Sequence, residues 1–234
     1  MDPNFILLGM IWYIVFIISI SVHEASHAFA ALKFGDDTAY RGGQVSLHPL
    51  PHIMREPFGT IVVPLVSYAL GGFMIGWASA PYDPSWAAGN PKKAAYMGLA
   101  GPASNLLLVI VAGVLIHAGI WAGWFYQPDS ISFSTVVEPV SAGMANGPAV
   151  MLSLLFSLNC LLFVFNLIPV PPLDGTALVE LSLKGEKLVK YRQLMSNPTA
   201  CFVGLIIAWN LFGPIFRPIH NLALNILYPG SNYQ

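Results

Sequence analysis

Charged residues are scarce in this chain: 9% of its 234 residues are charged and 56% are hydrophobic. A typical soluble domain has about 25% charged residues. So few charges cannot cover a water-facing surface, which excludes a soluble globular protein and predicts an integral membrane protein. The net charge of -1 gives no reason to expect nucleic-acid binding.

Cysteine is nearly absent as well. Cys160 and Cys201 both lie inside apolar runs, so the sequence offers no disulfide framework and no CxxC metal site. We interpret both as small buried side chains. The length suits a single integral membrane domain over residues 1–234, with a core at about 5–195 and a C-terminal membrane segment at 199–228.

Four long apolar runs predict an all-α polytopic membrane protein with about four full transmembrane helices. They cover about 5–34, 94–122, 148–168 and 200–216, and the path of the stretch to 228 stays open. The first run is too long for a signal-peptide core and has Asp2 ahead of it, so we expect a retained membrane helix. Residues 176–197 are predicted to form a polar surface helix, and residues 38–50 a small β element with the alternating stretch Gln44–Leu47.

A fifth apolar run, residues 57–80, is interrupted by Pro64 and by the pair Gly71-Gly72. Basic residues near membrane segments favour the cytoplasmic side. If residues 57–80 crossed the membrane, Lys92 and Lys93 would lie opposite Lys33 and the other early basic residues. A re-entrant or broken segment avoids this conflict and puts nine basic residues on one side, which predicts an N-terminus outside.

The first apolar run ends in His23-Glu24-Ala25-Ser26-His27, an HExxH motif. On a helix, residues i and i+4 share one face, so both imidazoles can reach one zinc ion while Glu24 takes a proton from water. Ionisable residues inside an apolar helix are costly and indicate a functional site. A polar flank beyond the membrane edge is the alternative, but the apolar run AFAALKF follows His27.

A catalytic zinc site needs a third protein ligand. Asp174 stands out because it follows a spanning run and the break Pro169-Val170-Pro171-Pro172. It is equally consistent with an ordinary N-cap for the next helix. With 57–80 re-entrant, two full spans separate His27 from Asp174, so both lie at the same membrane face, as a shared metal site requires.

The sequence resembles the site-2 protease family (peptidase family M50), the intramembrane metalloproteases. The resemblance rests on HEASH at 23–27, GPASN at 101–105 and NLIPVPPLDG at 166–175. The stretches SLHPLPH and GGFMIGWASAP further resemble the compact bacterial and archaeal branch without PDZ or CBS domains. The resemblance implies one Zn²⁺ per chain held by His23, His27 and Asp174, with Glu24 as general base.

Four other polar residues are candidates with open roles. The resemblance implies that Asn166 steadies the substrate backbone; from the sequence alone, an interhelical hydrogen bond is the preferred interpretation. Asn105 is expected to tie helices together or to line the site. His48, where the branch usually has Asn, and His52 are either ordinary polar residues or accessory groups near the zinc.

The sequence therefore predicts a zinc-dependent intramembrane endopeptidase in the cell membrane, with its active site toward the cytoplasm. Its expected partners are the lipid bilayer and membrane-protein substrates with a transmembrane helix, while its oligomeric state stays open. The rival is a non-enzymatic membrane metal-binding protein or transporter. A transporter usually shows repeated halves, and no repeat is found in this sequence.

Overall fold

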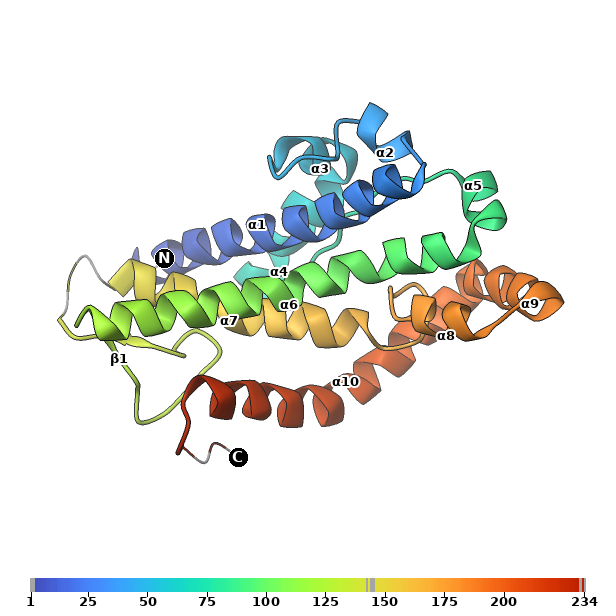
Figure 1. The fold of residues 1–234 in the computed structure, drawn as a ribbon. Coiled ribbons are helices and arrows are strands. Elements are labelled where there is room, and N and C mark those ends of the chain that lie inside the picture. Colours follow the sequence, from blue (N-terminus) through green and yellow to red (C-terminus); the bar gives the residue numbers. More distant parts are fainter. Residues whose placement is uncertain (1–2, 142, 144–145, 232, 234) are drawn as a thin grey trace. The chain divides into compact units, whose positions relative to one another are not determined.

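The computed structural model describes residues 3–141, 143, 146–231 and 233, which are mainly helical (Figure 1). Its helices and strands, in chain order, are α1 (Pro3–Phe34), α2 (Thr38–Arg41), α3 (Leu50–Arg55), η1 (Phe58–Val62), α4 (Val63–Gly71), α5 (Pro84–Gly89), α6 (Pro91–Trp121), β1 (Phe125–Tyr126), β2 (Glu138–Pro139), α7 (Asn146–Asn166), α8 (Thr176–Ser182), α9 (Gly185–Met195) and α10 (Pro198–Leu227).

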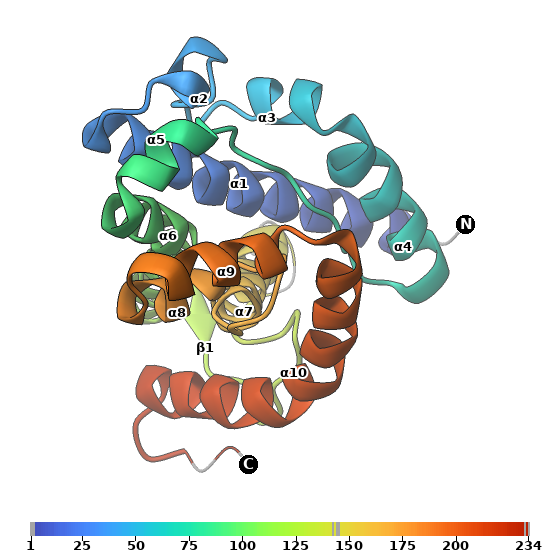
Figure 2. The same ribbon diagram turned by 90° about the vertical axis from the view of Figure 1, so that its right-hand side faces the viewer.

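Four of these helices are long and apolar enough to cross a membrane: α1, α6, α7 and α10, with 32, 31, 21 and 30 residues. A spanning helix needs about 20 residues. The all-α polytopic fold with four full spans is therefore confirmed. Helix α10 contains Pro214 and Pro218 and is bent along its length, as Figure 2 shows. Each proline removes one backbone hydrogen bond, which allows the bend.

The chain forms two compact units. The first unit comprises the chain up to Glu24, Ser46–Ser79 and Asn105–Cys160; the second comprises Ala25–Val45, Ala80–Ser104 and residues 161–234. Because the boundaries fall inside α1, α6 and α7, these three helices contribute to both units. The single-domain prediction stays a prediction.

In the first unit, the connection between α6 and α7 forms the two-stranded antiparallel sheet β1–β2, which the sequence did not predict. Ser153 of α7 accepts hydrogen bonds from the backbone N–H groups of Val136 and Val137, at 2.9 and 3.1 Å. The ring of Phe133 stacks on Trp12 of α1. These contacts hold the connection against two long helices.

Residues 57–80, also in the first unit, form a broken segment. η1 and α4 together have 14 residues, about 20 Å long and too short for a hydrocarbon core of about 30 Å. The helix ends at Gly72, whose φ of +73° suits glycine, and a non-helical stretch returns to the start. There Trp77 N–H donates to the Gly59 carbonyl at 3.2 Å, and Ser79 Oγ donates to Glu56 at 2.7 Å. Both ends of the segment thus meet, which agrees with the predicted re-entrant path.

The predicted β element at 38–50 is wrong. Asp36 accepts hydrogen bonds from the backbone N–H (3.0 Å) and hydroxyl (2.5 Å) of Thr38, which start the helical turn α2. Gly43, with φ of +73°, then turns the chain away. Residues 44–47 have no strand partner among the described residues. The predicted helix at 176–197 is divided into α8 and α9, because Leu183 and Lys184 between them have extended backbones.

Candidate metal centre

His23 and His27 lie one turn apart on α1, and both rings have their Nδ1 atoms occupied. His23 Nδ1 lies 2.6 Å from Asn105 Oδ1, and His27 Nδ1 lies 2.8 Å from the Met97 carbonyl oxygen. Each contact leaves Nε2 as the atom with an available lone pair when Nδ1 carries the proton. Metal-binding histidines are held in this way, by a second bond to an amide or carbonyl oxygen.

Asp174 lies in the loop between α7 and α8, and its Oδ2 is 3.3 Å from His27 Nε2. One ligand atom from each of His23, His27 and Asp174 lies within 4.8 Å of the other two. Two ligands of a tetrahedral zinc ion, each about 2.0–2.1 Å from the metal, are about 3.3–3.5 Å apart. The His27–Asp174 pair has this separation, and the three residues fit zinc in donor type and number.

The Asp174 loop is held by two close backbone approaches within the second unit. Gly175 N–H donates to the Asn166 carbonyl at 2.6 Å, and a Cβ on Gly175 would collide with the Leu167 and Ile168 carbonyls. A Cβ on Gly204 of α10 would collide with the Pro171 carbonyl. Glycine is thus required at both positions by space rather than by its torsion angles.

Apolar packing completes the support of this loop. Ile168 and Leu173 are buried against Ala208 of α10, and Phe165, Val170 and Phe212 pack around them. The Phe165 and Phe212 rings meet edge to face, with 5.6 Å between centroids. The proline-rich break identified in the sequence at 169–172 is therefore found where the loop packs against α10.

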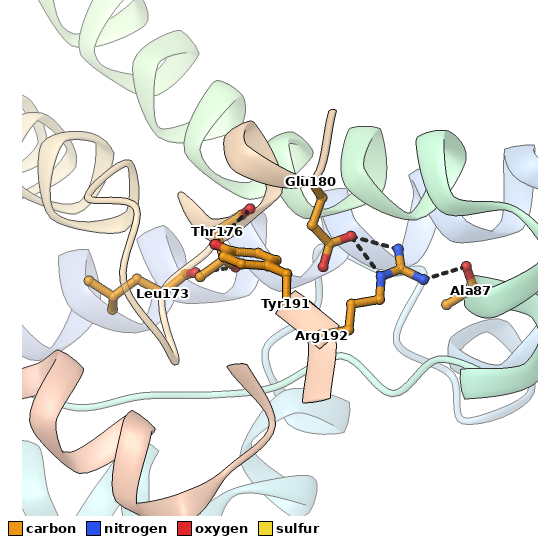
Figure 3. Close-up of polar contacts among 6 residues, drawn as sticks. All are labelled: Ala87, Leu173, Thr176, Glu180, Tyr191 and Arg192. Atoms are coloured by element: carbon orange, nitrogen blue, oxygen red, sulfur yellow. Dashed lines mark hydrogen bonds and ion pairs between the residues drawn. The ribbon is translucent and has the colours of Figure 1, made fainter. Parts of the chain in front are cut away.

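Polar contacts after the loop tie α8 to α9 and α5 (Figure 3). Thr176 Oγ1 donates to the Leu173 carbonyl at 2.9 Å, and Tyr191 OH donates to the Thr176 carbonyl at 3.4 Å. Arg192 donates to one Glu180 oxygen from Nε and Nη2, at 3.0 and 2.6 Å, and to the Ala87 carbonyl from Nη1 at 2.8 Å. Burial and then the Glu180 charge raise the pKa of Tyr191, so its hydroxyl stays a donor.

The alternative role of Asp174 as a helix cap is not realised, because the N-cap of α8 is Gly175. The Asp174 carboxylate instead lies against His27. A carboxylate beside an imidazole in an apolar helical environment is expensive without a cation. The arrangement is what a divalent metal ion would stabilise.

Glu24 follows His23 on α1 and is nearly fully buried. Its carboxylate accepts no hydrogen bond from the residues that the structure describes. A carboxylate that is close to a metal ligand and has no other partner is available to take a proton from water. Its predicted role as general base stays a prediction.

The other predicted site residues are found in different surroundings. Asn105 is fully buried, and its amide faces both His23 and Asn159. Asn166 is half-buried at the end of α7, and its side-chain amide has no hydrogen-bond partner in the described part of the chain.

His48 and His52 are not part of the metal-ligand group found among the described residues. His48 is exposed, and its Nδ1 accepts a hydrogen bond from Leu50 N–H at 3.2 Å. His52 is fully buried, with Nε2 2.9 Å from the Ser46 carbonyl oxygen. Their accessory role near zinc stays a prediction.

Sequence reasoning missed Asn159 and the Met97 carbonyl. Asn159 is a fully buried amide in the apolar helix α7. Such a residue could have been singled out, because polar side chains in spanning helices usually face a partner. The Met97 carbonyl carries no sequence signal, since every residue has one.

Four helices are apolar and long enough to span a bilayer, and two histidines and an aspartate lie close enough together to hold one ion. These features define the class: a multi-pass helical membrane protein with a zinc-type ligand set. Comparison with protein families is more specific. The family described as Peptidase family M50 matches residues 11–209, and the chain belongs to this family. The resemblance inferred from the motifs is thereby confirmed.

Curated relatives agree with this assignment. YwhC of Bacillus subtilis, named as a zinc metalloprotease, is 35% identical over 172 residues, which cover 71% of this chain and 66% of YwhC. Rip2 of Mycolicibacterium smegmatis, also named as a zinc metalloprotease, is 29% identical over 170 residues, or 73% of this chain and 56% of Rip2. The chain thus matches just under two thirds of YwhC and about half of Rip2. A comparison with solved structures gives no match.

Proposed function

We propose that this protein is a zinc-dependent intramembrane endopeptidase that holds one zinc ion per chain through His23, His27 and Asp174. The observation that supports it most is the close group of these three ligand atoms, with Glu24 directly after His23 on α1. Membership in peptidase family M50 and the names of the relatives support peptide hydrolysis. A bound zinc ion would supply Lewis-acid chemistry, since it acidifies water and polarises a carbonyl.

The residues of the chain have distinct tasks in this proposal. His23 and His27 bind through Nε2, because Asn105 and Met97 occupy their Nδ1 atoms. Glu24 takes a proton from the attacking water and then passes it to the leaving amine. Burial of these groups keeps bulk water away and strengthens each electrostatic contact.

A transmembrane substrate must unwind before its carbonyls are accessible, because a helix uses them in hydrogen bonds. An extended substrate can pair with an extended edge. Residues 42–47 form no strand, whereas residues 73–79 are non-helical, with exposed Phe73, Ile75 and Trp77 around buried Met74. We place the substrate at this return stretch; the role of Asn166 as a contact to the substrate backbone stays a separate expectation from the family resemblance.

The proposed location is a cell membrane, with the zinc toward the cytoplasmic side and the N-terminus outside. The distribution of lysine and arginine supports this orientation. The meeting of Gly59 with Trp77 supports a segment that returns to the side from which it came. Labelling of single cysteines at Arg55 and Asp83 tests the orientation, and labels on opposite faces would contradict it.

The decisive experiment separates metal binding from proteolysis. Wild type and Glu24→Gln are purified and placed in liposomes with a single-span reporter protein that carries a different tag at each end. Glu186→Gln is the matched control, because this glutamate is exposed on α9 and pairs with Lys190 at the surface. Zinc content is measured by mass spectrometry, and cleavage by the separation of the tags.

We expect one zinc ion per chain in all three proteins and cleavage by wild type and Glu186→Gln alone. Cleavage by Glu24→Gln at the wild-type rate would refute the role of Glu24. Zinc bound without cleavage by any of the three, over a panel of such reporters, would favour the rival metal-binding protein or transporter.

A further inference from the structure

A continuous row of hydrogen bonds leads from His23 into the core of the first unit. His23 Nδ1 faces Asn105 Oδ1 at 2.6 Å, and Asn105 Nδ2 donates to Asn159 Oδ1 at 2.8 Å. Asn159 Nδ2 donates to Ser19 Oγ at 2.9 Å, and Ser19 is again on α1, one turn before His23. Ser19, Asn105 and Asn159 are each fully buried, so water does not compete for these bonds.

The far end of the row has a fixed direction. The carbonyl oxygens of Val15 and Leu155 can only accept hydrogen bonds. Ser19 donates its one proton to Val15 at 2.7 Å, so its oxygen accepts from Asn159. The second proton of Asn159 Nδ2 goes to Leu155 at 2.8 Å. If this amide were turned over, its oxygen would face the Leu155 oxygen at that distance, so its orientation is set by the network.

This direction is transmitted to the metal ligand. Because Asn159 presents an oxygen, Asn105 must present its nitrogen to Asn159 and its oxygen to His23. An oxygen facing Nδ1 requires a proton on Nδ1, which puts the lone pair of His23 on Nε2. Two backbone carbonyls, which cannot donate, thus determine the tautomer of His23 through two amides.

We infer that Ser19, Asn159 and Asn105 form a directional relay that fixes the Nδ1–H tautomer and ring orientation of His23 before any metal binds. Asn159 is then a positioning residue two bonds away from the ligand. The inference deepens the proposed function, because it rests on His23 as a zinc ligand. Partners that orient metal-binding histidines typically change metal affinity about 10–100-fold when they are removed.

A matched pair of substitutions at one position distinguishes this relay from packing. As the neutral acid, Asn159→Asp keeps its carbonyl oxygen toward Asn105 and donates its O–H to the Leu155 carbonyl, so Asn105 still presents its oxygen to His23. Asn159→Leu removes that oxygen and frees the Asn105 amide to turn. If Asn159 served only to fill space between apolar helices, leucine would be tolerated better than a buried carboxyl group.

Two readouts are measured on the whole protein in nanodiscs. The first is the tautomer of His23 in zinc-free protein, from ¹⁵N shifts of histidine-labelled samples at a pH where the rings are neutral, assigned with His23→Asn. The second is zinc affinity, by competition with a chromophoric chelator. We expect wild type and Asn159→Asp to show the Nδ1–H tautomer, and Asn159→Leu to show a mixture with about 10-fold weaker zinc binding.

Ser19→Ala and Ser153→Ala provide a milder pair. Both serines are buried on long helices, but Ser153 bonds to Val136 and Val137 outside the relay. Only Ser19→Ala should shift the tautomer and weaken zinc binding.

An Nε2–H tautomer in wild type, or an unchanged tautomer in Asn159→Leu, would overturn the relay. Failure of wild type to bind zinc, with the expected tautomer present, would instead overturn the proposed function and leave the relay in place.

Discussion

Gly204 of α10 gives a sharp test of how Asp174, the proposed third ligand, is positioned. In Gly204→Ala, the new methyl carbon would lie 3.0 Å from the Pro171 carbonyl carbon and would overlap its oxygen. Two carbons pack best at about 3.5–4.0 Å, so the loop must move by roughly 1 Å. Pro171 lies three residues before Asp174, and metal sites tolerate ligand displacements of about 0.2 Å.

We therefore expect Gly204→Ala to weaken zinc binding strongly, although residue 204 belongs to a different helix from every ligand. A misplacement of about 1 Å can cost on the order of 100-fold in activity, and we expect a loss of similar size in zinc affinity. Chelator competition in nanodiscs measures the affinity, and circular dichroism checks the helical content.

Gly213→Ala is the matched control on the same helix, because a Cβ at Gly213 meets nothing within 4 Å. It should bind zinc like wild type and gain slightly in helix stability. If Gly204→Ala retained wild-type zinc affinity with an unchanged fold, α10 would not position the Asp174 loop and the reasoning would fail.

Three further predictions concern stability. Arg192→Ala should lower the free energy of unfolding by about 1–3 kcal/mol, because it leaves the mostly buried Glu180 carboxylate without its partner. Arg192→Lys should recover part of this loss. Thermal unfolding measures both effects. Burial by itself would raise the pKa of Asp36, but hydrogen bonds from Thr38 and Asp83 outweigh it and lower that pKa. The stabilisation that follows from this lower pKa is complete above 3.8, the pKa of the unfolded state, and is lost as the pH falls through the folded-state pKa. Asp36→Asn removes this titration, so its melting temperature should fall less steeply at acid pH than that of wild type. Removal of zinc with a chelator should lower the melting temperature of wild type but not of His27→Ala, because a ligand of the folded state stabilises it.

The spans and the placement of His23 and His27 on one helix were predictable because their signals are local. Apolar length identifies a spanning helix, and spacing along one helix brings His23 and His27 to one face. The local sequence around Asp174 is equally consistent with a helix cap and with a metal ligand. Only the distribution of basic residues and the family motif favoured the prediction of a ligand.

What could not be predicted depends on contacts between distant segments. Gly175 and Gly204 stand out only when the Pro171 loop and α10 are in place, since neither residue has a left-handed torsion angle. The pairing of Asn105 with Asn159 depends on how two helices are rotated about their axes. The failed β element at 38–50 has a local cause, because Asp36 bonds to Thr38 and starts a helical turn that the alternation pattern does not reveal.

The exposure of α10 links the metal ligand set to the thickness of the bilayer. Only 11% of its most apolar stretch is buried inside the protein, so most of its surface faces outward, toward acyl chains in a membrane. Long spanning helices respond to a thinner or thicker hydrocarbon layer by tilting. A tilt of α10 would move Gly204 toward the Pro171 carbonyl or away from it, and so shift the loop that contains Asp174. Under the proposed function, lipid chain length would thereby become a variable of zinc affinity.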